Sequence, residues 1–295
     1  MAYERAVEQG ADVIEPDLVM SRDGVLLVRH ENEIGGTTDV ADRPVFAARR
    51  TTKTIDSQSV TGWFTEDFTW AELQTLKARE RLPDLRPANT AFDGLEPILT
   101  FEAVLEIART ASERTGRTIG VAPELKHPSY FAAIGLSLED VFVAMLERHG
   151  LTGADAPVIV QCFEVGTLER LRSRIDTSLL QLIAAEGGPA DRPDLTYAAM
   201  ITPEGLAQVA AYADWIGADM VLIEPEPNAP TALIAAAHAA GLKVAGWTFR
   251  AENLFLPPAD RIGDDPAAHG RLQERLARFA AYGLDAAFMD QPGFR

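Results

Sequence analysis

Short apolar runs alternate along the chain with longer segments whose apolar residues recur every three to four positions. The runs predict buried strands and the longer segments predict amphipathic helices. We expect principal strands at residues 12–18, 118–122, 157–163, 179–184, 219–223, 243–249 and 285–289. We expect helices at residues 1–10, 101–110, 138–149, 165–174, 203–213, 230–240 and 268–282. This alternation predicts an α/β fold with a parallel sheet and crossover helices.

The strand count leads to a more specific expectation. A closed barrel of parallel strands and crossover helices needs eight strands, and here the chain opens on a helix that a strand should precede. We therefore expect a TIM (β/α)8-type barrel that lacks its first strand, with an open sheet as the alternative. Residues 1–295 should form a single domain. Residues 35–98 break the alternation and should form an inserted segment over the mouth of the barrel, or else a peripheral subdomain.

Composition narrows the classes of partner. The 295 residues are 47% apolar and carry a formal charge of −17. That charge disfavours binding to nucleic acids or anionic membranes, and it is compatible with binding of a cation. The single cysteine, Cys162, excludes an internal disulfide, and its apolar flanks predict a buried structural thiol. We find no apolar run long enough for a transmembrane span and no leader, so we expect a soluble chain, exported only if its natural start lies further upstream.

Candidate chemistry begins at Glu15, Asp17 and His30. Residues two apart on a strand point to the same side, so the two carboxylates should lie together. Asp23-Gly24 predicts a tight turn, after which Val25–Val28 should return as a strand and bring His30 near them. Hard oxygen ligands beside an imidazole would suit a divalent cation and a proton-transfer group. Taken alone, such a pair is more often a solvated acidic strand end, with His30 as an unrelated surface residue.

Further polar residues follow the other predicted strands. In a barrel the carboxyl ends of the strands converge, so Glu124 could join the first two carboxylates as a third metal ligand. Lys126 would then offer positive charge to an anionic substrate, and Gln161 and Trp247 could line a binding wall. His127 should be turned aside by the Pro128-Ser129 that follows it.

Several strings extend the pattern over the whole chain: Gly10-Ala-Asp-Val-Ile-Glu15-Pro-Asp17, Arg29-His30-Glu, Gly62-Trp-Phe-Thr-Glu-Asp, Glu124-Leu-Lys126-His-Pro-Ser and Trp247-Thr-Phe-Arg-Ala-Glu-Asn253. The chain resembles the glycerophosphodiester phosphodiesterases, in particular a bacterial, often exported branch. The resemblance implies a TIM barrel and metal-dependent hydrolysis of a small-molecule glycerophosphodiester to glycerol 3-phosphate and an alcohol. It also implies that Glu15, Asp17 and Glu124 bind Ca²⁺ or Mg²⁺, that His30 is one of two catalytic histidines and that Lys126 faces phosphate.

The sequence departs from the family at one place. The family's opening His-Arg-Gly motif and Pro-Glu-x-Thr loop, which carry the other histidine, an arginine and a glutamate, do not occur in residues 1–295. We therefore expect the isolated chain to be weakly active or inactive, and restoration of that strand to rescue turnover. Three alternatives stay open: a barrel that binds metal and phosphodiester without turnover, a lysophospholipase D-like relative, and a structural protein in which these residues are scattered.

Overall fold

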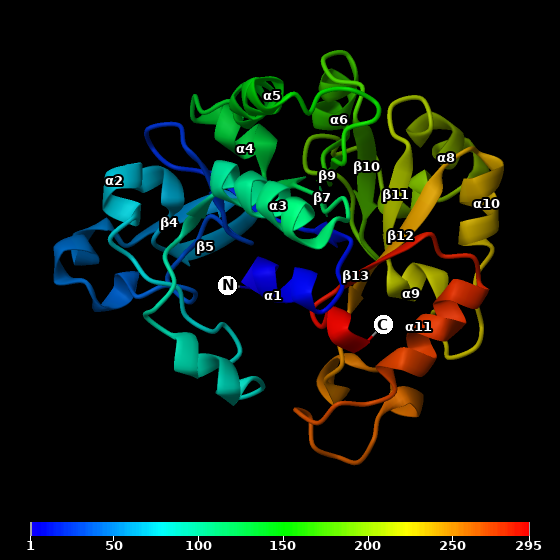
Figure 1. The fold of residues 1–295 in the computed structure, drawn as a ribbon. Helices are drawn as coiled ribbons and strands as arrows, with labels where there is room; N and C mark the ends of the chain where they lie inside the picture. The colour runs from blue at the N-terminus through cyan, green and yellow to red at the C-terminus, as the bar shows by residue number, and fades with distance from the viewer. Residues whose placement is uncertain (1, 295) are drawn as a thin grey trace. The chain divides into compact units, whose positions relative to one another are not determined.

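The computed structural model of the protein describes residues 2–294. Its contacts divide the chain into two compact units. The first unit contains Met1–Val7 and Asp12–Val158, and the second contains Glu8–Ala11 and Ile159–Arg295. Each unit combines parallel strands with helices that pack on them, so the predicted α/β class is confirmed (Figure 1).

The strands of the first unit are short: β1 (Val13–Ile14), β2 (Asp17–Met20), β3 (Leu26–Val28), β6 (Leu99–Thr100), β7 (Gly120–Val121) and β8 (Glu124–Leu125). Strand β2 pairs in parallel with β8 and antiparallel with β3, and β3 pairs antiparallel with β6. Strand β1 pairs in parallel with β7. This order places the start of β2 directly beside the start of β8.

The single strand predicted at residues 12–18 is divided in the structure. Glu15 and Pro16 separate β1 from β2. Proline has no backbone N–H to donate to a sheet, so a strand is interrupted where it occurs. The carbonyl oxygen of Pro16 still accepts a hydrogen bond from the amide of Glu124 at 3.0 Å. The chain therefore stays beside β8 across the break. The strict alternation of side chains, from which Glu15 and Asp17 were predicted to point to the same side, does not continue through it.

The predicted turn and return strand are confirmed. Gly24 has a φ of +82°, a left-handed conformation that glycine adopts without steric cost. The amide of Ser21 donates to the carbonyl of Val25, and the chain returns as β3. The amide of Arg29 donates to the carbonyl of Asp17 at 3.0 Å, which brings the residues after β3 alongside the start of β2.

Helices α1 (Ala2–Glu8), α3 (Phe101–Thr115), α4 (Pro128–Ala133) and α5 (Leu138–His149) complete this part of the fold. The side chain of Thr100 caps α3 by accepting from the amide of Ala103. Helix α3 packs on β3, β6 and β7, and α5 packs on β3. Phe101 and Phe142 stack with their ring centroids 5.6 Å apart, so the two helices share one apolar core.

Residues 35–98 belong to the first unit and contain a hairpin, short 3-10 helices and the single-turn helix α2 (Trp70–Leu73). The hairpin pairs β4 (Thr51–Ile55) antiparallel with β5 (Gln58–Gly62). Its two turn residues, Asp56 and Ser57, both have positive φ angles. The hairpin therefore holds Asp56 at its tip in a defined, left-handed conformation.

The second unit contains five strands in parallel register: β9 (Ile159–Cys162), β10 (Ser178–Ile183), β11 (Trp215–Asp219), β12 (Lys243–Phe249) and β13 (Ala286–Met289). They lie side by side in chain order, with α6 (Val165–Arg172), α8 (Pro203–Val209), α10 (Leu233–Ala239) and α11 (Leu272–Ala281) following successive strands (Figure 1). Cys162 is buried in β9, as expected.

One predicted strand is wrong. Residues 219–223 were expected to be extended, whereas the strand is β11 and Met220–Ile223 forms the helical turn α9. The carboxylate of Asp219 accepts a hydrogen bond from the amide of Val221 at 3.0 Å, which starts the turn. Trp215 begins the segment that pairs with β10 and β12 on either side. Apolar character alone could not distinguish a strand from a helical turn over so few residues.

Among the described residues, no helix has both the length and the apolar character needed to cross a bilayer.

Candidate metal and phosphodiester site

Three carboxylates converge in the first unit. Asp17 opens β2, Glu124 opens β8, and the two residues are direct partners in the parallel register. Glu15 precedes β2 by two residues. One oxygen from each of Glu15, Asp17 and Glu124 can be chosen so that all three lie within 4.8 Å of one another. The predicted meeting of three acids from neighbouring parallel strands is therefore present.

Burial and charge perturb this cluster. Burial raises the pKa of Glu124 to about 7, the negative charge of Asp17 adds to the rise, and the ammonium group of Lys126 opposes it. Lys126 Nζ lies 3.0 Å from Glu124 Oε1 and 3.3 Å from Asp17 Oδ1. Burial alone would lower the pKa of Lys126, but these two carboxylates raise it above its usual range. Lys126 therefore neutralises part of the charge of the cluster.

The donor set fits a hard divalent cation. Three carboxylates with one adjacent ammonium group leave net negative charge in a partly buried place, and closely spaced buried carboxylates resist ionisation unless positive charge compensates them. Carboxylate oxygens are the ligands that Ca²⁺ and Mg²⁺ prefer. Burial, with a smaller contribution from the negative charge of Asp17, raises the pKa of Glu124, and a bound divalent cation would lower it.

Tyr3 lies in the electrostatic field of the cluster, and Arg29 interacts electrostatically with Tyr3. Burial raises the pKa of Tyr3 above its usual range, and the charges of Glu15 and Asp17 raise it further. Burial lowers the pKa of Arg29 to about 10. Its guanidinium donates to the carbonyl of Thr37 at 2.8 Å. Tyr3 thus brings helix α1 to the acidic cluster.

His30 lies in the loop after β3, with its side chain about half exposed. Its Nδ1 atom is 3.0 Å from Glu31 Oε1. The other carboxylate oxygen of Glu31 is 3.2 Å from Nε2 of His127, and Nδ1 of His127 is 2.6 Å from Asp56 Oδ2. The expectation that His127 turns aside is wrong, because its ring is joined to the residue that contacts His30. His127 has a φ of +49°, which directs the chain sharply just before Pro128.

The electrostatic coupling between these groups is strong. Burial opposes the charged form of His127, but hydrogen bonds to Asp56 and Glu31 outweigh it and raise its pKa to about 9. Burial would raise the pKa of Glu31, whereas His127, His30 and Lys126 lower it well below its usual range. Because Lys126 also contacts two of the three acids, Glu31 connects the loop of His30 electrostatically to the carboxylate cluster.

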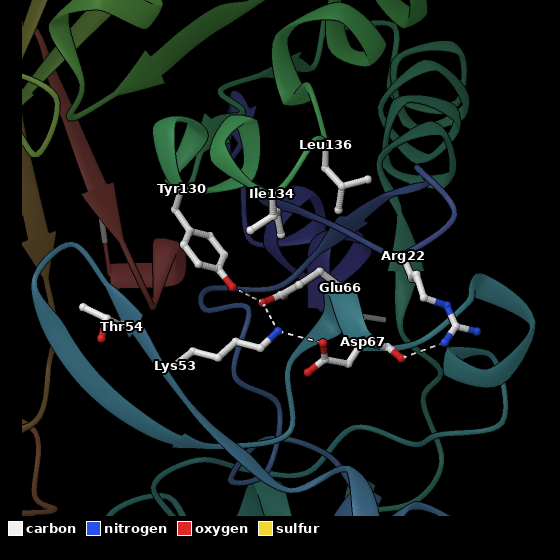
Figure 2. A pocket seen from close by; sticks show the side chains of 8 residues that line it. All are labelled: Arg22, Lys53, Thr54, Glu66, Asp67, Tyr130, Ile134 and Leu136. Atoms are coloured by element: carbon white, nitrogen blue, oxygen red, sulfur yellow. Dashed lines mark hydrogen bonds and ion pairs between the residues drawn. The ribbon is translucent and has the colours of Figure 1, made fainter.

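A pocket of about 510 Å³ lies in the same unit, lined by Arg22, Lys53, Thr54, Glu66, Asp67, Tyr130, Ile134 and Leu136. Figure 2 shows the side chains of Tyr130 and Lys53 converging on Glu66. Tyr130 donates to Glu66 at 2.5 Å, and Lys53 lies 2.8 Å from both Glu66 and Asp67. The side-chain amide of Asn32 also donates to the carboxylate of Glu66. These charges are engaged with one another, so the pocket wall is a structural network.

Gln161 and Trp247, the predicted wall residues, belong to the second unit. Gln161 is buried in β9, in register with Leu180 of β10. Trp247 Nε1 donates to the carbonyl of Gly217 at 2.8 Å, and its ring packs edge-on against Phe163. Their part in substrate binding stays a prediction.

Three residues near the site escaped the sequence reasoning, namely Tyr3, Glu31 and Asp56, and His127 was considered but set aside. Glu31 directly follows His30, so proximity in sequence was the available signal for it. Asp56 had no such signal, because a hairpin tip 71 residues from His127 in sequence meets it only after folding.

Together, parallel strands with packed helices and a cluster of three carboxylates near a histidine loop are features typical of barrel phosphodiesterases. The model of the glycerophosphoryl diester phosphodiesterase family matches residues 1–294, and the chain belongs to this family. Its fold is accordingly of the TIM-barrel type, and it is a phosphodiesterase of the hydrolase class.

Relatives and solved structures agree with this assignment. The glycerophosphodiester phosphodiesterase GDPD6 of Arabidopsis thaliana is 35% identical over 271 residues, which cover 86% of this chain and 71% of that protein. The glycerophosphodiester phosphodiesterase of Haemophilus influenzae is 26% identical, over 78% of this chain and 67% of that one.

The fold also matches solved structures. One from Silicibacter pomeroyi has a TM-score of 0.66 at 19% identity and covers 99% of this chain and 84% of its own. An Oleispira antarctica phosphodiesterase, solved with the product sn-glycerol-3-phosphate, has a TM-score of 0.62 at 17% identity. That match covers 98% of this chain and 85% of the other.

Proposed function

We propose that this chain hydrolyses small glycerophosphodiesters to sn-glycerol 3-phosphate and an alcohol, with a divalent cation held by Glu15, Asp17 and Glu124. The convergence of these three carboxylates within 4.8 Å carries the proposal. Membership of the family and the product named for the Oleispira antarctica relative support this substrate class.

We assign separate roles in the proposed hydrolysis to the cation, to Lys126 and to His30. A cation in this position would neutralise phosphate charge and lower the pKa of a coordinated hydroxyl. Lys126, already against Glu124 and Asp17, offers a further positive charge toward the anionic substrate. His30 transfers a proton to or from a reacting oxygen, a contribution typically worth about 100- to 10,000-fold in rate. Gln161 and Trp247 remain our predicted substrate-contacting residues in the second unit.

The test combines a product assay with calorimetry. The purified chain is incubated with glycerophosphocholine and either Ca²⁺ or Mg²⁺, and sn-glycerol 3-phosphate is measured with and without EDTA. We expect at most weak product formation by this chain, which depends on the divalent cation and disappears in Asp17→Asn and Glu124→Gln. Glu102→Gln, an exposed carboxylate on α3, is the matched control and should behave as the unaltered chain.

The outcomes separate the alternatives. Calorimetry that finds cation and glycerophosphocholine bound, while neither the chain nor a version extended by a strand that ends in His-Arg-Gly makes product, would identify a binding protein that does not turn its ligand over. Product that persists in Asp17→Asn and Glu124→Gln would refute the proposed metal site. The expected weakness of turnover remains a prediction, which the same assay checks by adding a strand that ends in His-Arg-Gly upstream of Met1.

A further inference from the structure

The contacts around His30 form a continuous series across three separate segments. The loop after β3 supplies His30 and Glu31, the segment between β8 and α4 supplies His127, and the tip of the β4–β5 hairpin supplies Asp56. The atoms in contact lie 3.0, 3.2 and 2.6 Å apart in turn along the series from His30 to Asp56. Each carboxylate therefore alternates with a ring, as in an acid–imidazole relay.

This arrangement distinguishes the two nitrogens of the His30 ring. In a neutral imidazole one nitrogen carries the hydrogen, and the hydrogen bond made by one nitrogen determines the role of the other. A carboxylate can only accept, so Glu31 favours a hydrogen on Nδ1 of His30. Nε2 is then left as the basic nitrogen, which is the form that a proton acceptor needs.

The carboxylate of Glu31 is itself held from its other side. One oxygen faces His30 and the other accepts from His127, so the group cannot rotate without loss of one contact. His127 is mostly buried, and its second nitrogen is bonded to Asp56. Both His127 and Asp56 have positive φ angles, a conformation that residues with side chains seldom adopt without support from their surroundings.

A second set of contacts ties the same three segments together independently. Buried Glu66 accepts from Asn32 in the His30 loop, from Lys53 in β4 and from Tyr130 in α4. Loss of the Glu31 contacts would therefore leave the loop, the hairpin and the helix in place. The half-exposed Glu31 side chain can be altered without unfolding of the protein, and its effect on His30 can be measured.

We propose that Glu31 is a positioning residue for His30, and that His127, braced by Asp56, holds Glu31 in that role. The inference rests on the proposed function for its consequence in catalysis. The geometry on which it depends is a property of the ligand-free chain.

The decisive experiment reads the two ring nitrogens directly. The chain has five histidines, so long-range ¹H–¹⁵N correlation spectra of the full chain can be assigned with one substitution per histidine. Over a pH titration that reaches the neutral ring, we expect His30 to carry its hydrogen mainly on Nδ1. In Glu31→Gln the ratio of the Nδ1–H to the Nε2–H form should fall about three- to tenfold, the worth of one hydrogen bond.

The other members of the series should act through Glu31. We expect a smaller fall in the same ratio in His127→Gln, and no additional fall when His127→Gln is combined with Glu31→Gln. His238→Gln is the matched control, because His238 pairs with Asp285 at 2.8 Å and lies in the second unit. An Nε2–H form that predominates in the unaltered chain, or a ratio unchanged in Glu31→Gln, would overturn the proposal.

Kinetics supply a second readout. With glycerophosphocholine, Glu31→Gln should lower kcat about tenfold and leave KM nearly unchanged, because the Glu31 carboxylate acts on His30 and not on the substrate. This decrease in kcat is smaller than the ~100- to 10,000-fold contribution of general acid–base catalysis by the histidine itself. A change confined to KM would contradict the proposal. If neither the unaltered chain nor a version extended by a strand that ends in His-Arg-Gly makes product, the proposed function fails, while the nitrogen ratios still decide the positioning role.

Discussion

At the scale of single residues, Lys126 shows how the chain balances its own acidic cluster. Its buried ammonium group lies against Glu124 and Asp17. It neutralises only part of the negative charge of the cluster, because Glu15 adds a third carboxylate. A divalent cation and Lys126 would therefore repel each other while both are attracted to the same acids. This competition leads to a prediction.

Substitution of Lys126 by methionine should separate binding of the cation from binding of the substrate. Loss of the ammonium group removes a positive charge near the site, so we expect Ca²⁺ or Mg²⁺ to bind at least about threefold more tightly. The KM for glycerophosphocholine should rise, because the anionic substrate loses an attractive charge. Calorimetry measures the first effect and the product assay the second. Weaker cation binding in the variant would show that Lys126 supports the site in another way.

His127 makes a pH-dependent contribution to stability. Its pKa is raised from 6.5 to about 9 in the folded chain, so the stabilisation is fully present below pH 6.5 and is lost as pH rises toward 9 and beyond. Because Asp56 and Glu31 are partly exposed, we discount the full effect to about 1–2 kcal/mol. Urea unfolding of the unaltered chain and of His127→Gln should differ more at pH 6 than at pH 10. An equal difference at both values would contradict the assignment.

At the scale of elements, the loop of His30 depends on segments that are distant in sequence. Helix α4, the β4–β5 hairpin and the loop after β3 meet at Glu66, as Figure 2 shows for the first two. Glu66 is buried, and Asn32, Lys53 and Tyr130 surround it with donors. The insertion at residues 35–98 therefore supplies anchoring contacts to the segment that carries His30.

Substitution of Tyr130 by phenylalanine tests this anchoring. The ring remains and only the hydroxyl that donates to Glu66 is lost. A hydrogen bond to a charged acceptor contributes about 1.5–3 kcal/mol, so we expect the free energy of unfolding to fall by roughly that amount. The midpoint of urea unfolding should drop while its slope stays constant. A midpoint that does not move would show that the hydroxyl finds solvent at no cost.

At the scale of the whole molecule, the formal charge of −17 sets the response to cations. A divalent cation that binds the folded chain at Glu15, Asp17 and Glu124 should stabilise it by about 2.7 kcal/mol at 100 times its dissociation constant. We expect a higher Tm with Ca²⁺ or Mg²⁺ and a return to the starting value with EDTA. Glu124→Gln should lose most of the gain. An equal gain from NaCl at matched ionic strength would attribute it to screening instead.

The single-domain organisation predicted for residues 1–295 is a further proposal at this scale. Neither of the two compact units is one uninterrupted stretch of chain, because helix α1 contributes Ala2–Val7 to the first and Glu8 to the second. We therefore expect one cooperative thermal transition, with a calorimetric enthalpy equal to the van't Hoff enthalpy. Two separate transitions would show that the units unfold independently.

The sequence by itself predicted the elements whose signals are local. Helix α5 and strand β12 begin and end where their apolar patterns indicated, and Asp23-Gly24 forms its turn. It also placed Glu15, Asp17 and Glu124 together, because the alternation of strands and helices predicted a barrel in which the carboxyl ends of the strands converge. The role of these residues as metal ligands stays a proposal.

Only the tertiary structure decided the rest. Residues 219–223 could not be assigned from apolar character, because pairing with β10 and β12 decides which residues of this region form the strand. The contacts of Glu31, His127 and Asp56 join positions up to 96 residues apart. No periodicity in the chain encodes such contacts. A hydrogen bond between loops depends on where the strands beneath them pair, because that pairing decides which side chains come within hydrogen-bonding distance.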